Sequence, residues 1–130
     1  MNRPTPIHIR PSFAFDAADV ERVLEFTERV EAMGFDGVFV GDRMLDAARS
    51  DGKLVYASTM IEVTTIMAAM AARTSRINIG VLVYIVPYRR PLQIAKTFAS
   101  LDALAKGRIV MGAGLGWNAK EFEALGLDMS

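Results

Sequence analysis

The chain alternates four times between a short apolar segment and a longer segment whose apolar residues recur with helical spacing. The short segments are rich in β-branched and aromatic residues, which is typical of strands covered on both faces in a parallel sheet. This order predicts a parallel sheet with crossover helices packed outside it. The predicted strands are residues 7–13, 35–40, 77–83 and 109–111, and the predicted helices begin near Asp16 or Asp19, Thr59, Pro91 and Trp117.

Residues with strong preferences for helix ends mark where these helices begin and end. Thr59 and Glu62 have the spacing of a capping box, and Pro91 suits the first turn of a helix. Gly34 follows Met33, the last apolar position of the first helix, and Gly107 follows Lys106; glycine commonly ends a helical run at such positions. The four helices are therefore predicted to end at Met33, Arg73, Lys106 and Leu125.

The connections between these elements are unequal in length. Turns from helix to strand are tight, whereas those from strand to helix are longer, and the polar segment 41–58 far exceeds the usual few residues. Barrels and doubly wound sheets both bind their ligands at the carboxyl ends of the strands. The asymmetry therefore predicts a site at that end and leaves both folds open.

The charge balance narrows the class of partner. Fifteen basic and fifteen acidic residues cancel and are scattered along the chain, which argues against a nucleic-acid or anionic membrane partner. The absence of cysteine excludes disulfides and zinc-thiolate sites, and no metal site is predicted. Since there is neither a signal-peptide pattern nor an apolar run of about 20 residues, we expect a cytoplasmic protein that acts on a small molecule.

Four blocks of sequence occur in a characteristic order. They are residues 36–43, 71–83, 87–104 and 107–126. Together these blocks resemble the N-terminal half of the bacterial luciferase-like family of flavin-dependent oxidoreductases. The resemblance implies a (β/α)8 TIM barrel of which residues 1–130 form one half-barrel domain with four βα units. A complete barrel needs about 250 residues, so we expect the chain to be a truncated product or a fragment of a longer parent.

The resemblance also implies a cofactor and a reaction class. Members of the family use reduced FMN with molecular oxygen, or coenzyme F-420, to oxidise, oxygenate or reduce a small organic substrate. We therefore expect an enzyme that forms a homo-oligomer such as a dimer, with a separate flavin reductase as a candidate partner. Two alternatives stay open: a non-catalytic flavin-binding protein, and an inactive truncated fragment of such an enzyme.

The ends of two predicted strands supply the first candidate site residues. Asp42 matches a family aspartate that helps to hold the flavin ring. Arg43 stands where the family usually has histidine; it is a candidate catalytic residue that could bind an anionic group or stabilise negative charge on a reduced ring. Leu82 and Val83 match the position at which the family has a non-prolyl cis peptide beneath the central ring, so they are predicted to back the cofactor.

The glycine-rich segment after the fourth predicted strand supplies further candidates. Gly112, Gly114 and Gly116 alternate at the strand end, where missing side chains would let a flat ring or a phosphate approach the backbone. The rival interpretation is a dinucleotide-binding fingerprint. That pattern needs glycine where Trp117 stands, and it belongs after the first strand, so the flavin interpretation is favoured.

Aromatic and amide side chains complete the predicted pocket. Trp117 and Asn118 are predicted to stack on and hydrogen-bond to the cofactor ring, although Trp117 could equally pack against Phe122. Ser12 and Phe13, which follow the first predicted strand, are candidates for the substrate pocket.

Three further ionisable residues are predicted to have no part in the chemistry. His8 is the only histidine and lies within the first predicted strand, before its carboxyl end, so a structural role is expected. Glu121 and Glu123 fall by their spacing on the solvated face of the last helix.

Overall fold

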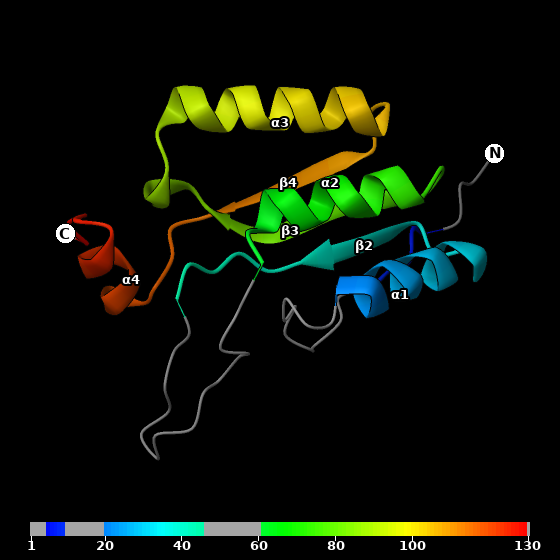
Figure 1. Ribbon diagram of the computed structural model, residues 1–130, viewed down its shortest axis with the longest axis horizontal. Helices are drawn as coiled ribbons and strands as arrows, with labels where there is room; N and C mark the ends of the chain where they lie inside the picture. Colours follow the sequence, from blue (N-terminus) through cyan, green and yellow to red (C-terminus); the bar gives the residue numbers. More distant parts are fainter. Residues whose placement is uncertain (1–4, 10–19, 46–60, 130) are drawn as a thin grey trace, which may run out of the picture.

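The computed structural model describes residues 5–9, 20–45 and 61–129. In this part of the chain a four-stranded parallel sheet has the order β1-β2-β3-β4 (Figure 1). The α/β class and the parallel sheet predicted from the alternating pattern are confirmed. The strands are β1 (His8–Ile9), β2 (Gly37–Val40), β3 (Asn78–Ile85) and β4 (Ile109–Gly114).

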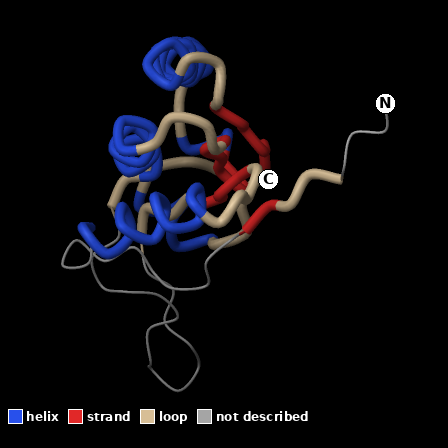
Figure 2. Tube along the Cα trace, turned by 90° about the vertical axis from the view of Figure 1, so that its right-hand side faces the viewer, coloured by secondary structure: helices blue, strands red, loops and turns tan. Residues whose placement is uncertain are grey.

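Helices follow the strands as predicted. Figure 2 shows the three long helices gathered on one side of the sheet, and Figure 1 shows the short last helix, α4, beyond the carboxyl ends of the strands. No helix within the described ranges is long and apolar enough to cross a membrane. The helices are α1 (Val20–Ala32), α2 (Val63–Arg73), α3 (Pro91–Ala105) and α4 (Ala119–Ala124), with a short 3-10 helix, η2 (Val86–Tyr88), after β3.

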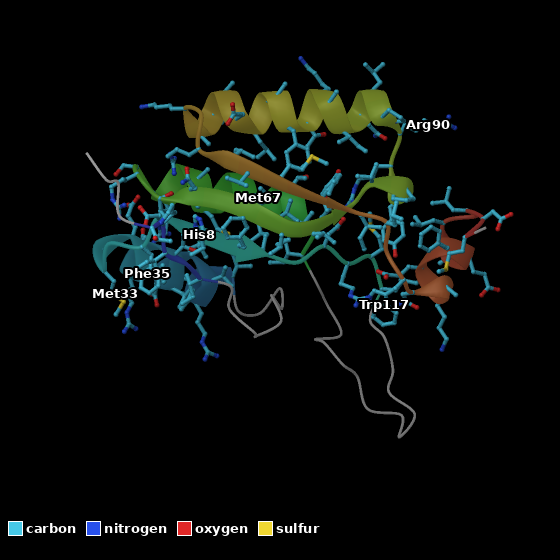
Figure 3. All side chains as sticks on the ribbon, turned by 180° about the vertical axis from the view of Figure 1, so that it is seen from behind. His8, Met33, Phe35, Met67, Arg90 and Trp117 are labelled. Atoms are coloured by element: carbon cyan, nitrogen blue, oxygen red, sulfur yellow. The ribbon has the colours of Figure 1, made fainter. Side chains whose placement is uncertain are left out.

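The core lies between the sheet and the three long helices. Alternate residues of the central strands face the helices and are fully buried. They pack against Met70 and Met67 of α2, so the methionines of this helix fill the core; Figure 3 labels Met67. These helix-facing strand residues are Val38, Val40, Ile79 and Val81.

The opposite face of the sheet is only partly covered in the described residues. Leu82, Val83 and Val110 are large apolar residues with exposed side chains on β3 and β4. In a closed barrel, this face of the strands is the interior. His8 packs edge to face on Phe39, with 5.2 Å between ring centroids, which agrees with the structural role expected of this histidine.

The predicted ends of the first two helices needed correction. Met33 was predicted as the last apolar position of the first helix, but it lies beyond α1 and is 69% exposed. The capping box predicted at Thr59 and Glu62 is wrong in register. Glu62 is itself the N-cap of α2, its side chain accepting a hydrogen bond from the Thr65 backbone, and Thr59 lies outside the described residues.

The glycine-rich segment was also predicted imperfectly. It was expected to be a turn from Gly112 onward, yet β4 extends to Gly114 and pairs with β3 up to Ile85. The last helix begins at Ala119 instead of at Trp117. Pairing along β3 stabilises this extension even though glycine has a low intrinsic preference for strands.

Candidate active site at the carboxyl ends of the strands

Three segments meet where β2, β3 and β4 end. They are residues 41–45 after β2, the helix η2 after β3, and the segment that leads from β4 into α4. Ile85, Tyr88 and Phe122 form a small second core there, with Met44 packed against it. The rings of Tyr88 and Phe122 meet edge to face, 5.1 Å apart. This small core fixes the polar residues around it relative to one another.

Asp42 forms a buried ion pair with Arg89. Its carboxylate accepts two hydrogen bonds from the Arg89 guanidinium and one from the backbone amide of Ile85, at 2.9 Å. Arg89 also donates to Glu62, at 3.2 Å, and lies over the ring of Tyr84. Burial alone would lower the pKa of Arg89, but its contact with Asp42 raises the pKa above the ordinary value. Asp42 therefore joins the end of β2 to the segment after β3.

Glu121 forms a second buried centre, and its predicted place on a solvated face is wrong. The side chain is fully buried. Its Oε1 accepts from the backbone amides of Met44 and Leu45, at 2.6 and 3.0 Å. Its Oε2 accepts from Arg43, at 3.1 Å, and from the Tyr88 hydroxyl, at 2.9 Å. One carboxylate thus links α4 to the segments that follow β2 and β3.

One sequence signal could have drawn attention to Glu121. It lies three residues after Asn118, the N-cap of α4, which is the spacing of a capping box. That spacing correctly places Glu121 in the first turn of a helix. It does not identify the backbone amides of Met44 and Leu45 as its partners, because they are more than seventy residues away in the sequence.

The hydrogen bonds to Glu121 keep it ionised. Burial alone would raise its pKa, but the amides of Leu45 and Met44, the Tyr88 hydroxyl and the Arg43 guanidinium lower the pKa below its ordinary value of 4.5. Burial, and then the hydrogen bond to Glu121, raise the pKa of Tyr88 well above its usual range, so its hydroxyl remains a donor.

The stability of the fold should therefore depend on the charge of Glu121. A carboxyl with a lowered folded-state pKa contributes stability above its unfolded pKa of about 4.5, and this contribution is lost as pH falls through the lowered value. Between about pH 6 and about pH 3, the urea midpoint of the wild type should fall more steeply than that of Glu121→Gln. Glu123→Gln, on an exposed position of the same helix, should keep the wild-type slope. Equal slopes for the wild type and Glu121→Gln would contradict this linkage.

Arg43 lies between Glu121 and Trp117. Its guanidinium carbon is 4.6 Å from the centroid of the Trp117 ring, while its Nη1 pairs with Glu121. Trp117 itself is 62% exposed, and Figure 3 shows it beside α4, at the opposite end of the sheet from His8 and Phe35. The ring of Phe122 meets that of Tyr88, whereas the ring of Trp117 rests on Arg43.

The peptide between Leu82 and Val83 is cis, as the resemblance implied. The pairing between β3 and β4 is irregular at this point, and the two side chains are 47% and 39% exposed. They present an apolar surface near the carboxyl end of β3.

Side chains on β3 require the two glycines of β4, Gly112 and Gly114, and also Gly116, which follows the strand. A Cβ added to Gly112 would lie 2.7 Å from Cδ1 of Leu82, and one added to Gly114 would collide with Val83. Gly116 has a φ of +81°, and a Cβ there would lie 2.7 Å from Cγ2 of Ile85. Packing therefore explains all three glycines, and their predicted role in cofactor approach stays a prediction.

Asn118 carries an unpaired donor. The residue is 7% exposed, and its Oδ1 accepts the backbone amide of Lys120 at the start of α4. Its Nδ2 is buried and has no hydrogen-bond partner in the part of the chain that the structure describes. A buried donor of this kind costs free energy unless a ligand or water supplies an acceptor. It is the feature of the site that fits a ligand with hydrogen-bond acceptors.

Two predicted pocket residues, Ser12 and Phe13, lie outside the described residues. Among residues 5–9, 20–45 and 61–129, there is no group of three or more side chains that could hold a metal ion.

Known proteins resemble the chain over most of its length. Residues 4–130 match the family described as luciferase-like monooxygenase. Limonene 1,2-monooxygenase of Rhodococcus erythropolis is 34% identical over 109 residues, which are 84% of this chain and 26% of the relative. An F420-dependent glucose-6-phosphate dehydrogenase of Amycolatopsis mediterranei is 32% identical over 105 residues, 80% of this chain and 30% of the relative. The chain thus spans less than a third of either curated relative.

Solved structures confirm the fold. Monooxygenase RslO1 of Streptomyces bottropensis superposes with a TM-score of 0.80 at 24% identity, over 96% of this chain and 37% of that one. The coenzyme F420 dependent tetrahydromethanopterin reductase of Methanopyrus kandleri gives a TM-score of 0.65 at 21% identity, over 95% and 30% of the two chains. The half-barrel arrangement of four βα units is that of luciferase-like TIM barrels. By its match over residues 4–130, its relatives and its fold, the chain belongs to the luciferase-like monooxygenase family.

Proposed function

We propose that the protein is a flavin-dependent oxidoreductase that binds reduced FMN or coenzyme F-420 at the carboxyl ends of its strands and acts on a small organic substrate. The observation that carries the proposal is the buried Nδ2 of Asn118 at that end of the sheet, which has no hydrogen-bond partner among residues 5–9, 20–45 and 61–129. The relatives named as a monooxygenase and as an F420-dependent dehydrogenase support the cofactor class and leave both cofactors open.

The residues of this chain fit such a cofactor by complementary chemistry. The exposed side chains of Leu82 and Val83 offer an apolar surface to a flat ring, Asn118 offers a donor, and Trp117 offers an aromatic face. When bound, the cofactor supplies the redox step, either activation of oxygen or hydride transfer, while the protein binds, orients and excludes water.

In this proposal Asp42 does not contact the cofactor directly but holds the residues that do. Both of its oxygens accept hydrogen bonds from Arg89, and one also accepts from Ile85. Its contribution is then to fix the carboxyl end of β3, where Leu82 and Val83 offer their apolar surface to the ring. The glycines of β4 contribute by leaving room for Leu82 and Val83.

The first test is a fluorescence titration of the full-length protein with FMN and with coenzyme F-420, each oxidised and reduced. Tightest binding of reduced FMN supports an oxygenase fed by a flavin reductase, and preferential binding of F-420 supports a hydride-transfer enzyme. Binding of neither would contradict the proposal. Cofactor-dependent turnover separates an enzyme from a non-catalytic flavin-binding protein.

The role of Asn118 has its own matched variant. Asn118→Asp keeps an oxygen that can cap α4 but replaces the Nδ2 donor, so cofactor affinity should fall about tenfold without loss of the helix. Unchanged affinity in this variant would show that the donor does not serve the cofactor.

We also expect self-association of the 130-residue chain. β1 and β4 are the edge strands of the described sheet, and unpaired edges invite pairing with another chain. Light scattering at protein concentrations on the order of tens of micromolar should give a mass above 14.2 kDa. Val110→Lys, which places a charge on an exposed position of β4, should reduce the association. A monodisperse wild-type monomer would contradict this expectation.

The flavin reductase as a partner and the cytoplasmic location of the protein both stay predictions.

A further inference from the structure

The only tryptophan of the chain, Trp117, has a mostly exposed ring that contacts an arginine side chain. Trp117 is 62% exposed, so packing does not fix its ring. In the part of the chain that the structure describes, a charged group contacts the ring: the Arg43 guanidinium lies over it, 4.6 Å from its centroid. Such a contact is favourable because the face of the indole is electron-rich. It leaves the position of the indole dependent on the position of Arg43.

Arg43 is held in turn by Glu121. The Arg43 side chain is 8% exposed, and its Nη1 donates to Oε2 of the fully buried Glu121, at 3.1 Å. The other oxygen, Oε1, is fixed by the backbone amides of Met44 and Leu45. Four donors therefore converge on one carboxylate, and three of them do not belong to Arg43. The other three donors hold the Glu121 carboxylate in place, and Arg43 forms its ion pair with a carboxylate that is already fixed.

We propose that Glu121 is a positioning residue that acts through Arg43 to hold the Trp117 indole as a fixed aromatic surface at the mouth of the candidate active site. The inference rests on the function proposed above only for the identity of the flat ring that would stack on this surface. It gives Arg43, predicted from the sequence as a catalytic residue, the role of a link between a buried anion and an exposed ring.

The two oxygens of Glu121 allow a selective test. Glutamine keeps the length of the side chain, and its carbonyl oxygen can still accept from the amides of Met44 and Leu45. Its amide nitrogen then stands in the place of Oε2, where it can donate to the Tyr88 oxygen, since a hydroxyl also accepts hydrogen bonds. It cannot accept from Arg43. Glu121→Gln therefore keeps the link to the backbone and breaks the link to the guanidinium.

The readout is the fluorescence of Trp117 in the ligand-free 130-residue chain. With the ion pair between Arg43 and Glu121 broken, the guanidinium is held less firmly over the indole, so the acrylamide quenching constant should roughly double and the fluorescence anisotropy should fall. The matched control, Glu123→Gln, alters an exposed carboxylate on the same helix and should leave both values at those of the wild type. Far-UV circular dichroism shows whether each variant is folded.

Arg43→Met is the second variant, because it removes the guanidinium from both Glu121 and the Trp117 ring but leaves Glu121 with its backbone and Tyr88 donors. It should reproduce the Trp117 signature of Glu121→Gln, and it decides the question if Glu121→Gln fails to fold. Unchanged quenching and anisotropy in a folded Glu121→Gln or Arg43→Met protein would overturn the proposal, even if stability is lowered. Since no cofactor is present, this outcome is independent of whether FMN or F-420 binds.

Discussion

Replacing Arg108 by methionine is expected to lower the free energy of unfolding by about 3 kcal/mol, because five hydrogen bonds from one guanidinium are lost. Its Nε donates to the carbonyl of Ala105 at 2.8 Å. Its two terminal nitrogens reach the carbonyls of Ala71, Thr74 and Ile77 and the hydroxyl of Thr74, at 2.9 to 3.1 Å. Methionine fills a similar volume but supplies no donor.

The position of Arg108 explains the size of the effect. It lies where α2 and α3 end, and the last carbonyls of a helix have no partner within the helix. A cation there also interacts favourably with the negative end of each helix dipole. Arg108 satisfies both helix ends and the start of β3 with one side chain, so its loss affects three elements.

Urea denaturation measures this effect directly. Arg108→Lys should recover at most half of the loss, because an ammonium group cannot present a planar fork of five donors. Arg90→Met, at an exposed arginine before α3, is the matched control and should lie within about 0.5 kcal/mol of the wild type. A similarly small effect of Arg108→Met would contradict the prediction.

The fold was predictable because its signals are local. Each apolar segment is covered on one face by a helix with matching periodicity, and Pro91 and Gly107 mark the ends of α3 through the chemistry of their own backbones. Lys106, the C-cap of α3, takes the left-handed conformation just before Gly107, which also has a positive φ. The extension of β4 to Gly114 was missed because it depends on pairing with β3, which no property of the glycines reveals.

The candidate site was predictable only in part. The loops at the carboxyl ends of the strands were expected to hold the site, and Asp42, Arg43 and Trp117 do lie there. Their partners were not predicted, because Asp42 pairs with a residue 47 positions away and Arg43 with one 78 positions away. Fifteen basic and fifteen acidic residues allow many different ion pairs, and the spacing of apolar residues along the chain does not indicate which of these pairs form.

The misplacement of Glu121 has a similar cause. In a long amphipathic helix, spacing separates the buried face from the solvated face. α4 has six residues, too few for its own pattern to define a face, and the segment after β2 covers the side on which Glu121 lies. The environment of a residue in so short a helix is therefore set by its neighbours in space.

Removing the Asp42 carboxylate is expected to be the costliest single change at the candidate site. Asp42→Ala should lower the free energy of unfolding by about 3 to 5 kcal/mol, because it leaves Arg89 charged and only partly paired in a buried position. It also leaves the Ile85 amide without its acceptor. Asp36→Ala is the matched control: that carboxylate accepts one backbone hydrogen bond, from Ile7, at an exposed position, so its loss should cost less than about 1 kcal/mol.

A double-mutant cycle shows whether the cost comes from the unpaired charge. Replacing Asp42 by leucine and Arg89 by methionine together should cost less than the sum of the two single changes by about 2 kcal/mol or more, since no buried charge is then left without its partner. If the two changes add, the pair contributes little and Asp42 must be retained for another purpose. The carboxylate would then be free to serve the cofactor directly, whereas strong coupling supports a role in which Asp42 fixes the carboxyl end of β3.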